Sequence, residues 1–526
     1  MVPDLPIFNH TIYHSGFTES FYDPRTLLTK ILAPNLEGQE KKEFVLRGFE
    51  YNATVIHERV HWFQHHGTSF GCFLEALRLS QQNTTLRWLR EMPSSRVRDF
   101  LRQRVEFTTP ILEIDPQTRH PIFAQGDEHD QMNLFRQIWF DHQWVHAVFE
   151  DSRISKQLGK PPGTVIGEVV GDVMLALCAE HDFLPQTKNA ILTTPLTARQ
   201  WFSVDDTEMM FVSISGMYLT SKILMECAAT ISELQLLPES LWMPVLGKAG
   251  VETVLTNRIK TILDGDYGIP IRSLLVVLNA GLDRLLDVLP TVNVLCFIAL
   301  NPPLPPYVMH PPDDAPSWRW QDIYPPIRFA RLALCVKKVG LLSDCRDHRT
   351  IATYIDKLCD VCQLPHTINT NYPDRISYEE TPCFADENTV YSDSLKFSHH
   401  DYIFWVQSCL MRYRLNALPL MVSFGDCLSG DLLKQYVNDV LNFDAVPFSR
   451  CPLGWTKNDK LGFSCSVDFG NWLFRSILMD YVLFDVVAGT GKYDLSSFPG
   501  EINQNEIIYE FLEKNIILNL TEVRNT

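Results

Sequence analysis

The sequence contains too little positive charge for a protein whose main partner is nucleic acid. It has 46 Lys and Arg residues against 63 Asp and Glu residues, so its formal net charge is −17 at pH 7. Binding to nucleic acid depends on a basic surface that neutralises phosphates. The charge balance therefore argues against nucleic acid as the main partner, although it says nothing about the fold.

Long apolar segments are missing as well. The first ten residues, MVPDLPIFNH, contain neither the basic region nor the apolar run of a secretory signal peptide. A membrane-spanning helix needs about 20 apolar residues, and the nearest candidate, residues 288–300, is too short and contains Pro290 and Asn293. The 13 cysteines are odd in number and scattered, which is typical of reduced cysteine in a cytosolic protein. We therefore expect a cytoplasmic protein with no membrane partner.

Several local signatures of function are also absent. The chain contains no phosphate-binding glycine loop, no GxSxG nucleophile motif and no convincing internal repeat. Cys359 and Cys362 form a CxxC pair without a second CxxC, which argues against a structural zinc at that place. What the chain does contain is one short stretch, near its N-terminus, with the spacing of a catalytic metal site.

That stretch is an HExxH motif, His57-Glu58-Arg59-Val60-His61. Residues four apart lie on one face of a helix, so the two imidazoles can bind one cation. Glu58 follows the first histidine and can reach a water on that cation as a general base. Two imidazoles, one further protein ligand and an open water position form the usual catalytic zinc site.

The residues around the motif favour a helix. An apolar stripe with helical spacing runs through it and consists of Val55, Ile56, Val60 and Phe63. Gly67 marks the expected end of the helix, and we expect His65 and His66 to lie off the face of His57 and His61. The alternative is that the two motif histidines are merely packed or solvated on a helix face.

Glu226 is the predicted third ligand. It is the only acidic residue in residues 214–231, ISGMYLTSKILMECAATI, which belong to a helix expected over about residues 207–235. An ionised carboxylate in such an apolar run is costly unless it is paired or bound to a metal. Glu also commonly completes a zinc site that contains two histidines.

The sequence offers other candidates for the same role. Glu168 and Asp172 lie on one face of an apolar segment and are the rival third ligands, while a structural salt bridge of Glu226 is a further alternative. His142 and His146 repeat the spacing of the motif histidines, but no Glu follows the first of them. A packed or surface role is therefore expected for that pair.

The stretches HERVHWFQ, GTSFG and MECAA together resemble the gluzincin type of zinc metallopeptidase. More closely, the chain is similar to poorly characterised bacterial proteins with HExxH, an aromatic residue and Gln, then a Gly-Thr turn and a distant E-x-x-A helix. This resemblance implies His57, His61 and Glu226 as zinc ligands and Glu58 as base and proton shuttle. The chain departs from the compact gluzincins in the wide gap between His61 and Glu226, and no downstream Tyr or His matches their oxyanion-stabilising residue.

Helical periodicity dominates the remaining chain, so the predicted fold is mainly α-helical with minor β structure. The proline-rich residues 301–326 form the clearest seam, because their proline density forbids helix interiors and favours extended backbone. We expect a metallopeptidase-like domain over residues 1–300, and a helical C-terminal domain over residues 327–526 that packs on the first.

The expected function is hydrolysis of peptide bonds in a protein or peptide substrate, with Glu58 activating a zinc-bound water. The alternative is a non-catalytic scaffold or regulated effector subunit with a structural or vestigial metal site. The length of the chain and its large helical second half favour that alternative. In that case we expect the chain to bind a regulatory protein partner. A third possibility is a zinc hydrolase that acts on a non-peptide amide or ester. The motif supplies the groups that activate the water, but it does not determine which acyl group is attacked.

Overall fold

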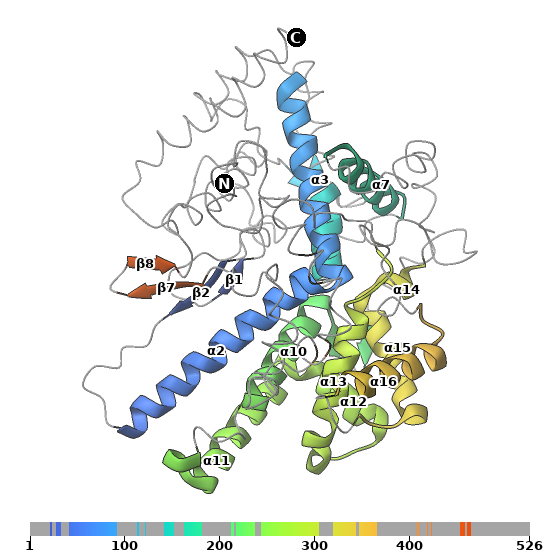
Figure 1. Cartoon of the computed structure of the whole chain (residues 1–526). Coiled ribbons are helices and arrows are strands. Elements are labelled where there is room, and N and C mark those ends of the chain that lie inside the picture. Colours follow the sequence, from blue (N-terminus) through green and yellow to red (C-terminus); the bar gives the residue numbers. More distant parts are fainter. Residues whose placement is uncertain are drawn as a thin grey trace.

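The computed structural model of the chain describes a set of helices and a few short strands (Figure 1). The described residues are 21–23, 28–32, 41–91, 113–114, 121–122, 141–151, 163–180, 212–214, 217–236, 243–304, 319–342, 347–365, 453–457, 460–463 and four single positions between 407 and 422. This part is mainly α-helical, so the predicted fold class is confirmed for it.

The HExxH motif lies on a long helix, α2 (Lys41–Gly67), and one residue separates this helix from α3 (Ser69–Glu91). Thr68 Oγ1 closes the turn between them, because it donates to the Gln64 carbonyl oxygen at 2.5 Å and accepts from the Gly71 amide at 3.1 Å. A Cβ atom on Gly71 would lie 2.4 Å from the Gln64 carbonyl oxygen. The close approach of the two helices therefore requires glycine, which explains the GTSFG that follows the motif.

The first turn of α3 is tied to a distant turn at the end of α13 (Leu285–Ala299). Three hydrogen bonds join them: Ser69 N to Asn301 Oδ1 (3.1 Å), Phe70 N to the Leu300 carbonyl oxygen (3.1 Å) and Ser69 Oγ to the Pro302 carbonyl oxygen (2.6 Å). They satisfy amides at a helix N-terminus that have no partner within the helix. The end of α2 is therefore held in place relative to α13.

Glu226 lies on α10 (Ser221–Leu236), which packs along α2. The helix begins later than the sequence pattern predicts, because an antiparallel hairpin of β5 (Val212–Ile214) and β6 (Met217–Leu219) precedes it. The expectation of one helix from about residue 207 is wrong over these strands. The hairpin pairs Val212 with Leu219 and Ile214 with Met217.

One apolar core joins the helices around α10. It includes buried side chains from α10, α13, α12 (Ile269–Leu278), α15 (Pro325–Val339) and α16 (His348–Cys362). Residues before and after the proline-rich seam thus share one core. Residues 305–318 and nearly all residues after 365 lie outside the described part, so the proposed domain boundaries stay a prediction.

A small sheet pairs segments that are far apart in the sequence. Its strand order is β1-β2-β7-β8, with β2 and β7 parallel and the other neighbours antiparallel. The strands are β1 (Phe21–Asp23), β2 (Leu28–Leu32), β7 (Leu453–Lys457) and β8 (Lys460–Phe463). The helix that carries the motif, α2, packs against β1 and β2.

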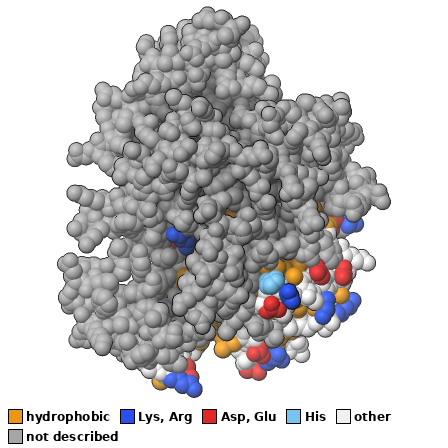
Figure 2. All heavy atoms as spheres, viewed as in Figure 1, with side chains coloured by type: hydrophobic (Ala, Val, Ile, Leu, Met, Phe, Trp, Pro, Cys, Tyr) orange, Lys and Arg blue, Asp and Glu red, His pale blue; other side chains and the backbone are white. Residues whose placement is uncertain are grey.

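The remaining elements are mostly helical. They are β3 (Glu113–Ile114) paired with β4 (Pro121–Ile122), a helix over residues 141–150, α7 (Gly163–Glu180), α11 (Met243–Asp264), η3 (Asp266–Gly268), η4 (Leu282–Arg284) and α14 (Trp320–Ile323). Within the described residues, none of the helices has both the length and the apolar character needed to cross a membrane. Where Figure 2 colours the surface, basic and acidic side chains are intermixed, which is typical of a water-exposed face.

Arg328 connects the start of α15 to the end of α13. Its side chain is completely buried and donates to the carbonyl oxygens of Asp322 (2.7 Å), Ile298 (3.0 Å) and Asn301 (3.2 Å). Burial lowers the pKa of the guanidinium to about 10, which leaves it charged at neutral pH. A cation beside the last carbonyls of a helix is favourable, so Arg328 stabilises the junction at the seam.

An Arg328→Met variant is expected to lower the free energy of unfolding by about 3 kcal/mol or more, because buried carbonyl groups lose a charged donor. Urea denaturation followed by circular dichroism measures this change. Arg284→Met is the matched control, since the side chains of Arg284 and of its partner Asp287 are 53% and 57% exposed and its loss should change stability by only about 0.5 kcal/mol. Equal stability of the two variants would contradict the role assigned to Arg328.

Candidate metal centre

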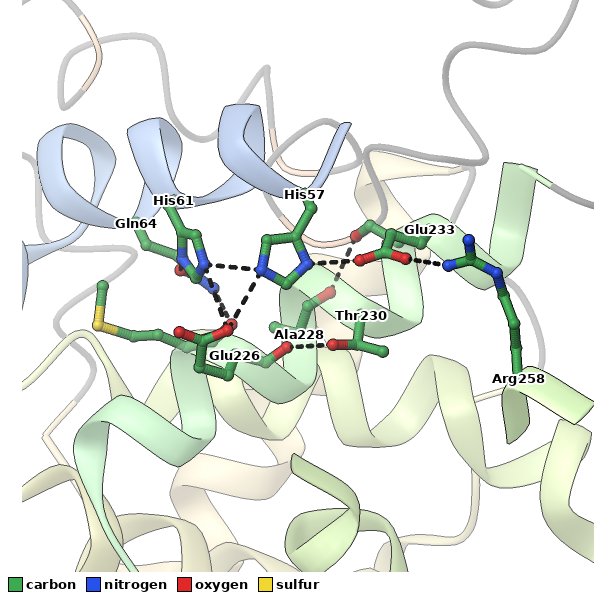
Figure 3. A network of polar contacts seen from close by, with 10 residues as sticks. His57, His61, Gln64, Glu226, Ala228, Thr230, Glu233 and Arg258 are labelled. Atoms are coloured by element: carbon green, nitrogen blue, oxygen red, sulfur yellow. Dashed lines mark hydrogen bonds and ion pairs between the residues drawn. The ribbon is translucent and has the colours of Figure 1, made fainter. Parts of the chain in front are cut away.

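The packing of α10 along α2 brings the three predicted ligands together (Figure 3). His57 Nε2 lies 3.1 Å from His61 Nε2 and 3.2 Å from Glu226 Oε2, and His61 Nε2 lies 3.6 Å from the same oxygen. All three side chains are largely buried, with 13–17% of their surface exposed. Among the described residues this is the one group of three side chains with the geometry of a metal site.

These distances can be compared with the edges of a zinc tetrahedron. Zinc binds imidazole nitrogen and carboxylate oxygen at about 2.0–2.1 Å in tetrahedral geometry, which places neighbouring ligand atoms about 3.3–3.4 Å apart. The observed separations of 3.1, 3.2 and 3.6 Å are close to that value on all three edges. The donor set therefore fits three corners of a tetrahedron around one ion.

The other ring nitrogen of His61 is held by Gln64, one turn later on α2. The Gln64 amide nitrogen donates to the Met225 carbonyl oxygen at 2.8 Å, so its Oε1 faces His61 Nδ1, also at 2.8 Å. A carbonyl oxygen can only accept, which orients the amide and makes Nδ1 of His61 the donor. His61 therefore carries its proton on Nδ1 and directs the lone pair of Nε2 towards Glu226.

The corresponding nitrogen of His57 is held by Glu233 on α10. Glu233 Oε1 lies 2.5 Å from His57 Nδ1, and its Oε2 accepts from Arg258 Nη1 at 2.7 Å (Figure 3). Arginine stays charged in proteins, so the paired carboxylate can only accept a hydrogen bond from His57. His57 thus also carries a proton on Nδ1 and presents Nε2 to the triad. Such outer partners fix the tautomer and orientation of histidines that bind metals.

These two hydrogen-bond chains leave three acceptor atoms facing one another: the Nε2 atoms of His57 and His61, and Glu226 Oε2. Acceptors this close repel unless a proton or a cation lies between them. Burial alone would raise the pKa of Glu226, but the facing histidines lower it, so the carboxylate is ionised at neutral pH. The side chains present therefore suit a divalent cation that binds nitrogen and oxygen, such as zinc.

A proton can separate these three acceptors in the same way as a cation. Burial alone would lower the pKa of His57, but hydrogen bonds to Glu226 and Glu233 outweigh it and raise the pKa to about 10. A metal ion must displace that proton, since metals bind the neutral imidazole. Metal affinity should therefore rise with pH and level off as pH passes the raised pKa.

We expect zinc binding at pH 7 to release about one proton per chain from His57. Isothermal titration calorimetry in two buffers with different ionisation enthalpies measures this release, because the observed heat then depends on the buffer. The same titration near pH 10 should show a smaller release. Binding heats at pH 7 that do not depend on the buffer would contradict the protonation of His57.

Glu58 is buried beside the triad, with 7% of its surface exposed. Burial raises the pKa of its carboxyl group, while the neighbouring His61 and His57 act in the opposite direction. The carboxyl group of Glu58 therefore interacts electrostatically with His61 and His57 and, more weakly, with Glu226. A carboxylate with a raised pKa is a stronger base than an exposed one.

The rival candidates lie elsewhere. Glu168 is exposed and Asp172 is half-buried on α7, a helix that packs against α3, and neither belongs to the group of three side chains. His142 is buried, and its Nε2 lies 2.9 Å from Ser80 Oγ, which agrees with the packed role expected for it. The rivals for the third ligand are therefore not brought to the motif.

His65 and His66 are both buried on α2 and are not part of the triad. Burial and nearby positive charge lower the pKa of His65 to about 3, so it is neutral. Their neutral state explains how two further imidazoles are accommodated next to the predicted site.

Two residues of the hydrogen-bond chain to His57, Glu233 and Arg258, were not predicted from the sequence. Glu233 follows Glu226 by seven residues, or two helical turns, so it lies on the same face of α10. That spacing was a usable signal, because a histidine ligand normally needs an acceptor for its second nitrogen. Arg258 gives no such signal, since its contact with Glu233 depends on how α11 packs.

Scans of the chain against protein-family models, curated proteins and solved structures each found no match. The resemblance to gluzincin-type peptidases therefore stays a prediction that rests on the motif residues.

Proposed function

We propose that this chain is a cytoplasmic zinc-dependent metallopeptidase that hydrolyses peptide bonds in a protein or peptide substrate. One observation carries the proposal: the donor atoms of His57, His61 and Glu226 converge, and an acceptor holds the second nitrogen of each histidine. A structural zinc site normally uses four protein ligands, whereas a catalytic site uses three and leaves one position open. The described residues supply three.

Zinc bound at this centre would supply a Lewis acid that lowers the pKa of water towards neutrality and polarises the carbonyl group of the substrate. Glu58 accepts the proton of the attacking water and returns it to the departing amine nitrogen. Gln64 and Glu233 keep the two histidines in the orientation in which both Nε2 atoms face Glu226. The burial of Glu58 keeps bulk water from solvating the carboxylate, so it remains an effective base.

The proposal is tested with the zinc-loaded full-length chain and a defined peptide library. Mass spectrometry would identify new peptide termini, with a chelator-treated sample and a Glu58→Gln variant as controls. New termini that depend on both zinc and Glu58 would support the proposal. A zinc-loaded chain that cleaves no member of the library would favour the structural-site alternative.

A further inference from the structure

We propose that Arg258 is a positioning residue that sets the metal affinity of the centre by holding Glu233 in place as the acceptor for His57. The inference rests on the proposed metal site and assigns a role to a residue that touches neither metal nor substrate. Arg258 lies on α11, which is a different helix from those that carry the predicted ligands. Three helices, α2, α10 and α11, therefore determine the orientation of one imidazole.

The contacts form a continuous chain of short distances. His57 Nδ1 lies 2.5 Å from Glu233 Oε1, and Glu233 Oε2 lies 2.7 Å from Arg258 Nη1. Each carboxylate oxygen of Glu233 thus has a separate partner (Figure 3). The Glu233 side chain is 13% exposed and that of Arg258 is 31% exposed, so solvent reaches the arginine end of the chain more easily than the carboxylate.

The charge of Arg258 explains why Glu233 can act as an acceptor. A carboxylate at this depth is costly unless a positive charge compensates it. Neutral His57, the form that binds a metal, does not provide that charge. Arg258 does, and its guanidinium cannot give up a proton at physiological pH. Without Arg258, Glu233 would lose both the compensating charge and the contact that orients its second oxygen.

The hydrogen-bond chains of His57 and His61 lead to different kinds of group. The chain from His61 ends at the main-chain carbonyl of Met225, which no side-chain substitution removes. The chain from His57 runs through Glu233 to Arg258, a side chain on a separate helix. The position of α11 is therefore coupled to His57 through Glu233.

The attachment of α11 does not depend on Arg258 alone. Five partly buried apolar side chains of α11 also pack against the core: Val254, Leu255, Ile259, Ile262 and Leu263. These contacts are retained when Arg258 is replaced, so Arg258 variants are expected to fold. A change in metal affinity can then be separated from a change in stability.

The experiment compares zinc dissociation constants of the full-length chain by competition with a chromophoric chelator. Arg258→Met removes the charge and keeps a side chain of similar length, and we expect about 10-fold weaker zinc binding or more, the range for orienting partners of metal ligands. Arg258→Lys should restore most of the affinity, because the contact uses a single guanidinium nitrogen. Lys260→Met, an exposed position on the same helix, is the matched control and should bind zinc like the wild type.

A double-mutant cycle shows whether Arg258 acts through Glu233. Glu233→Gln should weaken zinc binding, and adding Arg258→Met to it should cause little further loss. The visible spectrum of the Co²⁺-loaded variants gives a second readout, because it reports coordination geometry and not stability. Circular dichroism of each metal-free variant checks the fold.

Failure of the Arg258 inference can be distinguished from failure of the proposed metal centre. If wild type binds zinc and Arg258→Met binds it equally well, the inference is overturned and the proposed function stands. Fully additive losses in the double variant would also overturn it, since Arg258 would then act independently of Glu233. If the wild type binds no zinc, the proposed metal centre itself is wrong and the inference fails with it.

Discussion

A Glu58→Gln variant is expected to keep its bound zinc and to lose peptidase turnover by about 10²–10⁴-fold. Glutamine has nearly the same shape as glutamate, so the burial of the site is preserved. It has no carboxylate, however, and cannot accept the proton of the attacking water. Glu58 is not one of the three side chains whose donor atoms converge, so its replacement leaves the predicted ligands intact.

The measurement combines zinc content per chain with the rate of cleavage of a substrate found by library screening. Glu168→Gln is the control for loss of a carboxylate, because Glu168 is exposed on α7 and lies outside the site. That variant should retain both zinc and turnover. Full turnover by Glu58→Gln on a confirmed substrate would exclude Glu58 as the base.

The parts of the site that depend on local spacing could be predicted from the sequence. His57, Glu58 and His61 lie within five residues, and one helix determines their relative positions. Glu226 was predicted on a different basis, the cost of an isolated carboxylate in an apolar helix. The structure places it 3.2 Å from His57 Nε2, so a long-range contact followed from a local energetic argument.

The parts that depend on packing between helices could not be predicted in the same way. The sequence does not show that α11 places Arg258 beside Glu233, because no local pattern links residues 25 apart on separate helices. The hairpin before α10 was missed for a related reason. Its strands β5 and β6 are three residues each, and such short segments have too few residues to distinguish a period of two from a period of 3.6.

The proline-rich residues 301–326 could be predicted only in part from the sequence. Its proline density correctly excluded a long helix at its start, since α13 ends at Ala299. The sequence did not reveal that Asn301 would bond to Ser69 at the beginning of α3, on the other side of the motif. Residues that separate two helical regions in the sequence therefore also join the motif to the core.

Replacement of a predicted ligand is expected to have the largest effect on metal binding. His57→Ala and Glu226→Ala each remove one of three donor atoms, and each should weaken zinc binding by more than the roughly 100-fold limit for outer partners. Elemental analysis of the purified chains should find about one zinc in the wild type and almost none in either variant. Glu168→Ala, the rival ligand, should keep the metal because its side chain is exposed on α7.

The Glu226→Ala variant also distinguishes two roles of Glu226, a metal ligand or only the partner of His57 in an ion pair. Glu226 Oε2 lies 3.2 Å from His57 Nε2, so an ion pair alone could explain the lowered pKa of the Glu226 carboxyl group. If the ion pair were its whole function, Glu226→Ala would reduce stability but would not change how much zinc the chain binds. If Glu226 is a ligand, the stability of the zinc-loaded wild type falls when the metal is removed, because a metal that binds only the folded state stabilises it. The Glu226→Ala variant should then show the same thermal midpoint with and without added zinc, and a zinc-dependent rise in that variant would show that another residue completes the site.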